Sequence, residues 1–185
     1  YRIGLHATKS LVNNANSQYG ITFSEDGKIL PQGSYADGSL RVRQNNLAAL
    51  VDPFPSTRPE SFTRKTGVVT ETFYDFLGRP AVTSLPGVTE PGFWYKQKYN
   101  LSDTYTGDKF SYKDFDFGTA VSGVCYPPSN GMATSKGVSN YYSTANTNQT
   151  LHQSYLPDAM KFPFTRIVYE ADNASRPKVQ SGVGY

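Results

Sequence analysis

The segment "KTGVVTETFYDFLGRPAVTSLPG", residues 65 to 87, decides the fold of this chain. Its first half alternates two sets of side chains: Val69, Glu71 and Phe73 in one set, and Val68, Thr70, Thr72 and Tyr74 in the other. Alternation among β-branched and aromatic residues is typical of a β-strand. "DFLG" then supplies a turn, and "RPAVTSL" supplies the return strand. The segment therefore predicts a β-hairpin.

Four residues form a compact cluster around the predicted turn: Tyr74, Asp75, Gly78 and Arg79. The side chains of the tyrosine, the aspartate and the arginine can all take part in chemistry. Tyrosine and aspartate can act as acid or base in an active site. The same residue types hold turns together, because their side chains form hydrogen bonds with the backbone. The order of strand, Tyr-Asp, turn, Gly-Arg and strand favours the second interpretation, in which the cluster belongs to the hairpin itself.

The remainder of the sequence also favours strands. "ITFSEDGKIL" and "GSYADGSLRV" place Asp26-Gly27 and Asp37-Gly38 between alternating apolar stretches, as in tight turns with positive φ. Sixteen Gly and 12 Pro against two Met point toward strands, turns and loops rather than helices. The expected fold class is all-β, with antiparallel hairpins forming a twisted sheet connected by long irregular loops.

Three regions are expected along the chain. Residues 1–50 form an N-terminal hairpin region, in which "NNLAALV" has room for one helical turn at most. Residues 51–66 form a Pro-rich connection, since proline removes donors from a sheet ladder. Residues 67–185 form a second β region, with a polar loop near 126–150 and a return to strand-like alternation in "FPFTRIVYEADNASRPKVQSGVG".

The composition excludes several classes of protein. A formal net charge of +3, with lysines and arginines scattered rather than grouped, argues against nucleic-acid binding. A single cysteine excludes an internal disulfide framework and a Cys-rich zinc site. The sequence contains no stretch of about 18 apolar residues, so no membrane span is predicted. No cofactor and no metal is expected.

Residues suited to catalysis are sparse and separated. The two histidines, His6 and His152, lie among polar residues without a neighbouring nucleophile motif, and Cys125 has the apolar setting of a small buried thiol. Asp114 and Asp116 stand two apart, as at the start of a calcium loop, but the later Gly and terminal Glu of such a loop are missing. A solvated acidic edge is the simpler interpretation. The chain is therefore not expected to be an enzyme.

Two alternatives stay open for the aromatic region between residues 93 and 117. Trp94, Tyr95 and Tyr99 could stack against sugar rings in a module that binds glycan or a cell surface. Aromatic rings could equally fill the core of a chain that is short of Leu and Ile. The acids that a glycoside hydrolase would use are also present: Glu71, Asp75 and Glu90.

The motif "YDFLGR", residues 74 to 79, resembles the YD repeat of the bacterial RHS family. A second copy, "YEADNASR" at 169 to 176, carries Tyr169 and Arg176 at the corresponding positions around a longer turn. The stretch from residue 155 to 184 is similar to the segment that precedes the repeat core in large secreted RHS proteins of the polymorphic-toxin type. The copies are far apart instead of in tandem, so we expect one piece of such a system.

The resemblance implies a β-sheet strip that spirals into a hollow shell around a C-terminal toxin or effector, in a protein that is secreted or on the cell surface. The implied partners are the rest of the shell, the cargo and components of a secretion machinery. In the motif, Tyr74 packs on the sheet, Asp75 accepts hydrogen bonds from turn amides, Gly78 takes a positive φ and Arg79 reaches the next hairpin. These implied roles are structural.

Overall fold

The computed structural model describes residues 16–23, 29–49, 66–90, 94–117, 128–147, 155–172 and 174–184. The strands in these ranges are β1 (Asn16–Phe23), β2 (Ile29–Ala36), β3 (Val42–Ala49), β4 (Thr66–Tyr74), β5 (Pro80–Ser84), β6 (Gly87–Thr89), β7 (Phe164–Tyr169) and β8 (Pro177–Ser181). Two short helices are α1 (Tyr112–Phe115) and α2 (Gly137–Tyr141). Neither helix of this described part is long and apolar enough to cross a membrane.

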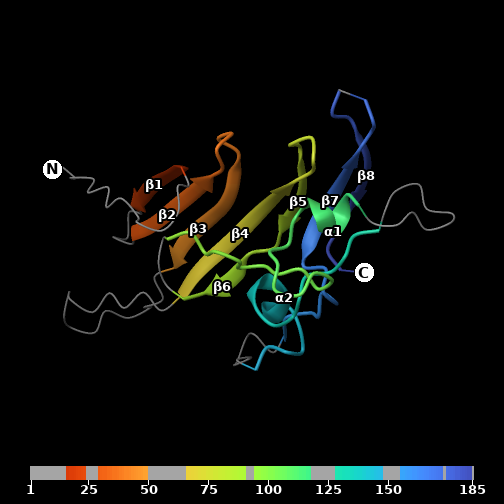
Figure 1. Cartoon of the computed structure of the whole chain (residues 1–185). Helices are drawn as coiled ribbons and strands as arrows, with labels where there is room; N and C mark the ends of the chain where they lie inside the picture. Colours follow the sequence, from red (N-terminus) through yellow and green to blue (C-terminus); the bar gives the residue numbers. More distant parts are fainter. Residues whose placement is uncertain are drawn as a thin grey trace, which may run out of the picture.

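All strands belong to one antiparallel sheet, which confirms the all-β fold class. The strand order is β1-β2-β3-β4-β5-β7-β8, and β6 pairs with the beginning of β4, where β5 no longer reaches. Three hairpin turns, β2–β3, β4–β5 and β7–β8, project from the same end of the sheet (Figure 1). We call these turns tips 1, 2 and 3.

The hairpin at residues 66–84 is confirmed: β4 and β5 pair across the turn that the sequence predicts. At tip 1 the hairpin is correct but the tight Asp37-Gly38 turn is wrong. Leu40, not Gly38, has the positive φ, of 60°. The reason is that the Asp37 side chain accepts hydrogen bonds from the amides of Ser39 and Arg41, which favours a longer loop. Asp26-Gly27 lies outside the described residues.

The helical turn considered for "NNLAALV" is wrong over residues 45–49, which belong to β3. Their side chains alternate, with Asn46 and Ala48 buried and Asn45 and Leu47 exposed, because β3 pairs on both sides with β2 and β4. Residues 51–65 lie outside the described part of the chain. Residues 128–147, within the expected polar loop, contain α2.

The core lies on one face of the sheet, beneath the segments 94–117 and 128–147. The larger cluster contains these buried residues: Phe73, Ala81, Val82, Phe110, Phe115, Met132 and Phe164. Within it, the Phe110 ring lies 5.1 Å from Phe73 and 5.5 Å from Phe164, between centroids. A second cluster consists of Val69, Tyr99 and Val138. Aromatic rings thus supply much of the buried area, as in a core short of aliphatic residues.

Candidate functional site

The three tips share one backbone design. In each hairpin the backbone amide of an acidic residue donates to the backbone carbonyl of an arginine. The pairs are Asp37 to Arg41 at 3.0 Å, Asp75 to Arg79 at 2.9 Å and Glu170 to Arg176 at 2.9 Å. The residue before each arginine has a positive φ: Leu40 at 60°, Gly78 at 82° and Ser175 at 52°. Tips 1 and 2 close over five residues and tip 3 over seven, so the three tips share the closing bond and the positive φ but not the loop length.

An aspartate braces each tip from inside. At tip 2 the carboxylate of Asp75 accepts hydrogen bonds from both the backbone amide and the Nε of Arg79, each at 2.7 Å. Asp37 accepts from the same two groups of Arg41, at 3.1 and 3.0 Å. At tip 3 Asp172 accepts from Arg176 Nε at 2.9 Å. The Asp–Arg pair, four residues apart, therefore fixes the direction of each arginine side chain.

A tyrosine connects tip 2 to tip 1, and another connects tip 3 to tip 2. Tyr74 of tip 2 donates its hydroxyl to the carbonyl of Val42, the residue after Arg41, at 2.9 Å. Tyr169 of tip 3 donates to the carbonyl of Pro80, the residue after Arg79, at 2.8 Å. The two tyrosines thus occupy equivalent positions on successive hairpins.

Arginine side chains cover the rings of both tyrosines. The Arg79 guanidinium carbon lies 4.6 Å from the centroid of the Tyr169 ring, and that of Arg41 lies 5.2 Å from the Tyr74 ring. Arg43 approaches Tyr74 more closely, at 4.5 Å. Arg79 also donates from Nη1 to the carbonyl of Glu170 at 3.2 Å, so it bonds within its own tip and with the next. A cation over an aromatic face is attractive, most of all when both groups are shielded from water.

We call this repeated arrangement the tip ladder. It comprises the braced tip pairs and the connecting tyrosines: Asp37, Arg41, Tyr74, Asp75, Arg79, Tyr169, Asp172 and Arg176.

Two features favour glycine at position 78 of tip 2. Its φ of 82° is a conformation that residues with a Cβ adopt only under strain. In addition, a Cβ placed there would lie 2.3 Å from Nη1 of Arg41 on tip 1. A side chain at position 78 would therefore displace the Arg41 guanidinium from its place between tips 1 and 2.

Burial around the tip 2 ion pair raises the pKa of two neighbouring side chains, Tyr169 and Asp116. The Asp75 side chain is only 4% exposed, and that of Arg79 is 18% exposed. Burial, followed by the charge of Asp75, raises the pKa of the Tyr169 hydroxyl, so that it remains a donor. Burial also raises the pKa of the nearby Asp116 carboxyl, and Asp75 adds to this rise, although the Phe76 amide donates to Asp116 at 2.9 Å.

The structure separates the acids considered for hydrolysis. Glu71 is fully buried and accepts hydrogen bonds from Gln44 at 3.0 Å and Asn100 at 2.9 Å, and it pairs with Lys109 at 3.1 Å. Asp75 instead pairs with Arg79, and Glu90 is exposed. The carboxylates thus have different partners, and Glu71 anchors the covering segment 94–110 to the sheet.

Asp114 and Asp116, whose spacing was compared with the start of a calcium loop, also have internal partners. Asp114 is fully buried and accepts hydrogen bonds from the Ser102 hydroxyl and the Ser111 amide, which caps α1. The interpretation of both acids as a solvated edge is therefore wrong for Asp114. Among the described residues no three His, Cys, Asp or Glu side chains gather as around a metal ion. His6, His152 and Cys125 lie outside those residues.

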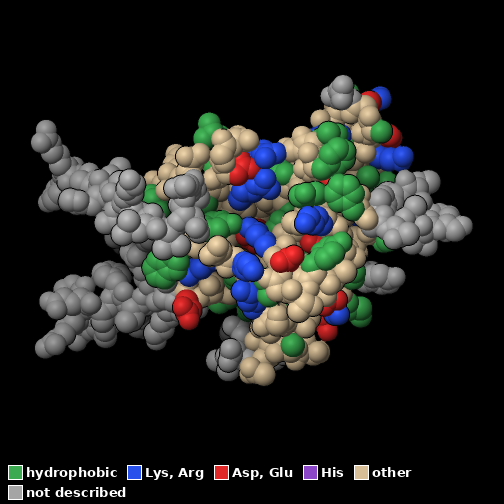
Figure 2. Space-filling model, in the orientation of Figure 1, with side chains coloured by type: hydrophobic (Ala, Val, Ile, Leu, Met, Phe, Trp, Pro, Cys, Tyr) green, Lys and Arg blue, Asp and Glu red, His purple; other side chains and the backbone are tan. Residues whose placement is uncertain are grey.

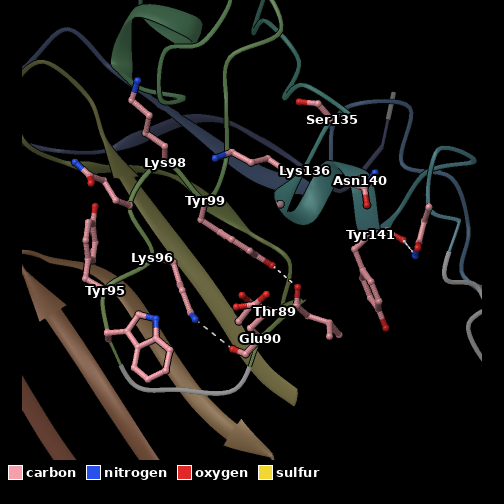
Figure 3. A pocket seen from close by; sticks show the side chains of 15 residues that line it. Thr89, Glu90, Tyr95, Lys96, Lys98, Tyr99, Ser135, Lys136, Asn140 and Tyr141 are labelled. Atoms are coloured by element: carbon pink, nitrogen blue, oxygen red, sulfur yellow. Dashed lines mark hydrogen bonds between the residues drawn. The ribbon is translucent and has the colours of Figure 1, made fainter. Parts of the chain in front are cut away.

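The three aromatic residues considered for sugar stacking have different environments. Trp94 is 56% exposed, Tyr95 is half-buried and accepts a hydrogen bond from Lys109 at 2.7 Å, and Tyr99 is buried in the core. Trp94, Tyr95 and Tyr99 all line a hollow of about 750 Å³. Lys96, Lys98 and Lys136 also line it (Figure 3). Lysine and arginine side chains gather over the middle of the same face of the molecule (Figure 2).

Sequence reasoning named the tyrosines and arginines of tips 2 and 3 and Asp75, but it missed Asp172, for which it took Glu170, and it missed the whole of tip 1. There Ala36 takes the place of the tyrosine, so the Tyr-Asp pair is absent. The signal that identifies all three tips is Asp-x-x-x-Arg, which occurs at Asp37, Asp75 and Asp172. No protein-family model, no curated protein and no solved structure matches this chain.

Proposed function

We propose that this chain is a structural, non-catalytic segment of an exported RHS/YD-repeat protein. In this proposal its sheet is part of a β-shell that encloses or delivers a C-terminal toxin or effector. The partners are the remainder of the shell, the cargo and components of a secretion machinery, and the location is outside the cell or at its surface.

The observation that carries the proposal is the repetition within the tip ladder. Tyr74 and Tyr169 make the same hydrogen bond to the residue after an arginine, on successive hairpins. A single hairpin cannot bury both of its faces, so repeated hairpins gain stability mainly from their neighbours. The buried polar groups of the ladder have partners inside the protein, which suits a structural role more than one in binding a substrate.

The experiment uses the product of the complete gene and measures limited proteolysis of its C-terminal region. The shell predicts a C-terminal region that resists protease until the protein is denatured. Arg79→Ala, which removes a contact between two tips, should increase cleavage, whereas Tyr155→Phe, at an exposed tyrosine, should not. A C-terminal region digested as fast in the native protein as after denaturation would overturn the proposal.

A second candidate function is an extracellular module that binds glycan or a cell surface. The observation that favours it is the exposed ring of Trp94 beside the lysine-lined hollow. Of the aromatic residues first considered, only Trp94 offers an exposed ring for stacking, and Lys96 already lies 4.5 Å from its centroid. A glycan array tests this candidate: Trp94→Ala should abolish binding, with Phe117→Ala as an exposed aromatic control. Absence of binding to any sugar would exclude it.

A further inference from the structure

Within the described residues, the tip ladder has one position that no tyrosine occupies. Arg41 and Arg79 each lie near the ring of a tyrosine from the following hairpin. Arg176 of tip 3 has the same aspartate brace, but its side chain is 72% exposed. Among the described strands β8 pairs with β7 alone, and four of its five residues are exposed. The edge strand β8 therefore follows an aspartate-braced arginine like those that contact Tyr74 and Tyr169, but no tyrosine of the described residues contacts this one.

The two occupied positions have the same strand register. Gln44 of β3 lies opposite Glu71 of β4, so continuing the pairing by three residues places Tyr74 opposite Arg41. Val82 of β5 lies opposite Arg166 of β7. The same continuation places Tyr169 opposite Arg79. In both cases the incoming strand is antiparallel, and its tyrosine lies across from the arginine that closes the preceding tip.

Strand β8 begins as β5 does, with a proline that directly follows an arginine. Arg176 is followed by Pro177, as Arg79 is followed by Pro80, whose carbonyl accepts the hydroxyl of Tyr169. Asp172 holds Arg176 through Nε and Nη2, so the guanidinium is oriented before any partner arrives. Side chains ordered in advance lower the entropic cost of association.

We propose that β8 is the docking edge for a further antiparallel strand that ends in a Tyr-Asp-x-x-Gly-Arg tip. The incoming tyrosine lies opposite Arg176, its ring rests on the guanidinium and its hydroxyl donates to the carbonyl of Pro177. The residue three positions before that tyrosine lies opposite Val179, as Glu71 and Arg166 lie opposite their partners. This inference rests on the proposed function and specifies the partner and register at one edge of the sheet.

Continuity with the ladder argues for this occupant over a second copy of the chain. Among the described strands β1 and β6 also have one partner each, but neither carries an aspartate-braced arginine followed by proline. A strand carrying the Tyr-Asp motif reproduces both interactions seen at the occupied positions, the ring contact and the hydroxyl bond. Exposed strand edges readily accept such additions.

The test adds a hairpin probe to the purified chain and follows hydrogen exchange of residues 177–181. The probe is a peptide with the sequence of residues 66–84, cyclised through its ends so that the hairpin is held before binding. At about ten times its dissociation constant, it should slow exchange in β8 about tenfold. The β1 amides should be unaffected.

Three variants make the test specific. A probe with Tyr74→Phe lacks the hydroxyl, and it should bind several-fold more weakly. Arg176→Ala in the chain should abolish protection, whereas Lys178→Ala, at an exposed residue of the same strand, should leave it intact. No protection by the cyclised probe, or equal protection with Arg176→Ala, would overturn the inference. Protection of β8 through a concentration-dependent dimer without probe would also overturn it, in favour of a second copy.

Two further variants of the purified chain distinguish a failure of the docking inference from a failure of the proposed function. Tyr169→Phe and Arg79→Ala are measured by thermal unfolding of the purified chain. If both destabilise the chain while β8 stays unprotected, the ladder holds and only the docking edge is wrong. If neither changes the midpoint, the ladder carries no stability and the proposed function loses its support.

Discussion

Replacement of Arg79 by alanine is the sharpest test of the tip ladder, because the chain contains its own control. Arg79 makes an ion pair with Asp75 at 2.7 Å, donates to the carbonyl of Glu170 at 3.2 Å and covers the Tyr169 ring at 4.6 Å. Arg176 occupies the same place in tip 3, but within the described residues its side chain bonds with its own aspartate alone and is mostly exposed.

The expected magnitude follows from burial. Arg79→Ala leaves the nearly buried carboxylate of Asp75 without its cation, which costs about 2 kcal/mol in this partly shielded pair. The lost cation–π contact adds about 0.5–1 kcal/mol. The total is about 3 kcal/mol of unfolding free energy, or roughly 6–12 °C in the melting temperature of a chain of this size. For Arg176→Ala the solvent-screened pair predicts a loss of at most about 1 kcal/mol.

The assay is urea unfolding of the two variants and the wild type, followed by tryptophan fluorescence and circular dichroism. Arg79→Lys serves as a second variant; it keeps the charge but not the planar fork, so its stability should fall between wild type and Arg79→Ala. Equal losses in Arg79→Ala and Arg176→Ala would refute the reasoning, because contacts between tips would then contribute nothing. An unchanged midpoint in Arg79→Ala would refute it as well.

Three further changes test other parts of the structure. Gly78→Ala should cost about 1–2 kcal/mol in thermal unfolding, because of its positive φ and the steric clash with tip 1, whereas Gly38→Ala, which meets no atom within 4 Å, should be neutral or slightly stabilising. Glu71→Gln should lower the urea midpoint, since it removes the buried carboxylate that pairs with the half-buried Lys109; Glu90→Gln, at an exposed residue, should not. Asp116→Asn should stabilise the chain at pH 7, because a raised folded-state pKa means that the ionised carboxyl opposes folding. That gain should shrink as pH falls through the folded-state pKa and vanish below the ordinary value of 3.8; a gain that persists there would contradict the assignment.

The sequence predicts the hairpin of β4 and β5 well, because alternation and turn chemistry are both local. The positive φ of Gly78 also follows from the residue type and its position before Arg79. Tip 1 is harder, because Leu40 adopts a conformation that its side chain disfavours. The Asp37 carboxylate stabilises it through hydrogen bonds that no propensity describes.

Local sequence patterns do not predict contacts between residues that lie far apart along the chain. Glu71 alternates with apolar residues like any surface acid, yet Lys109 and Asn100, far along the chain, bury it. The contact of Tyr169 with Pro80 likewise joins residues 89 apart in sequence. The residues of tip 2, with Tyr169 and Arg176, were therefore predictable, whereas Asp37, Arg41, Asp172 and the ladder geometry required the strand order.

Ala36 gives the ladder a direction. Each tip after the first contributes a tyrosine backward and presents an arginine forward, whereas tip 1 has alanine where that tyrosine would be and can only receive. The contact is head-to-tail, so the same contact can repeat from one hairpin to the next. During synthesis, tip 1 leaves the ribosome before tip 2, so the groups that receive Tyr74 precede it along the chain. Each later hairpin can then add to the edge of the one before it, in the order of translation.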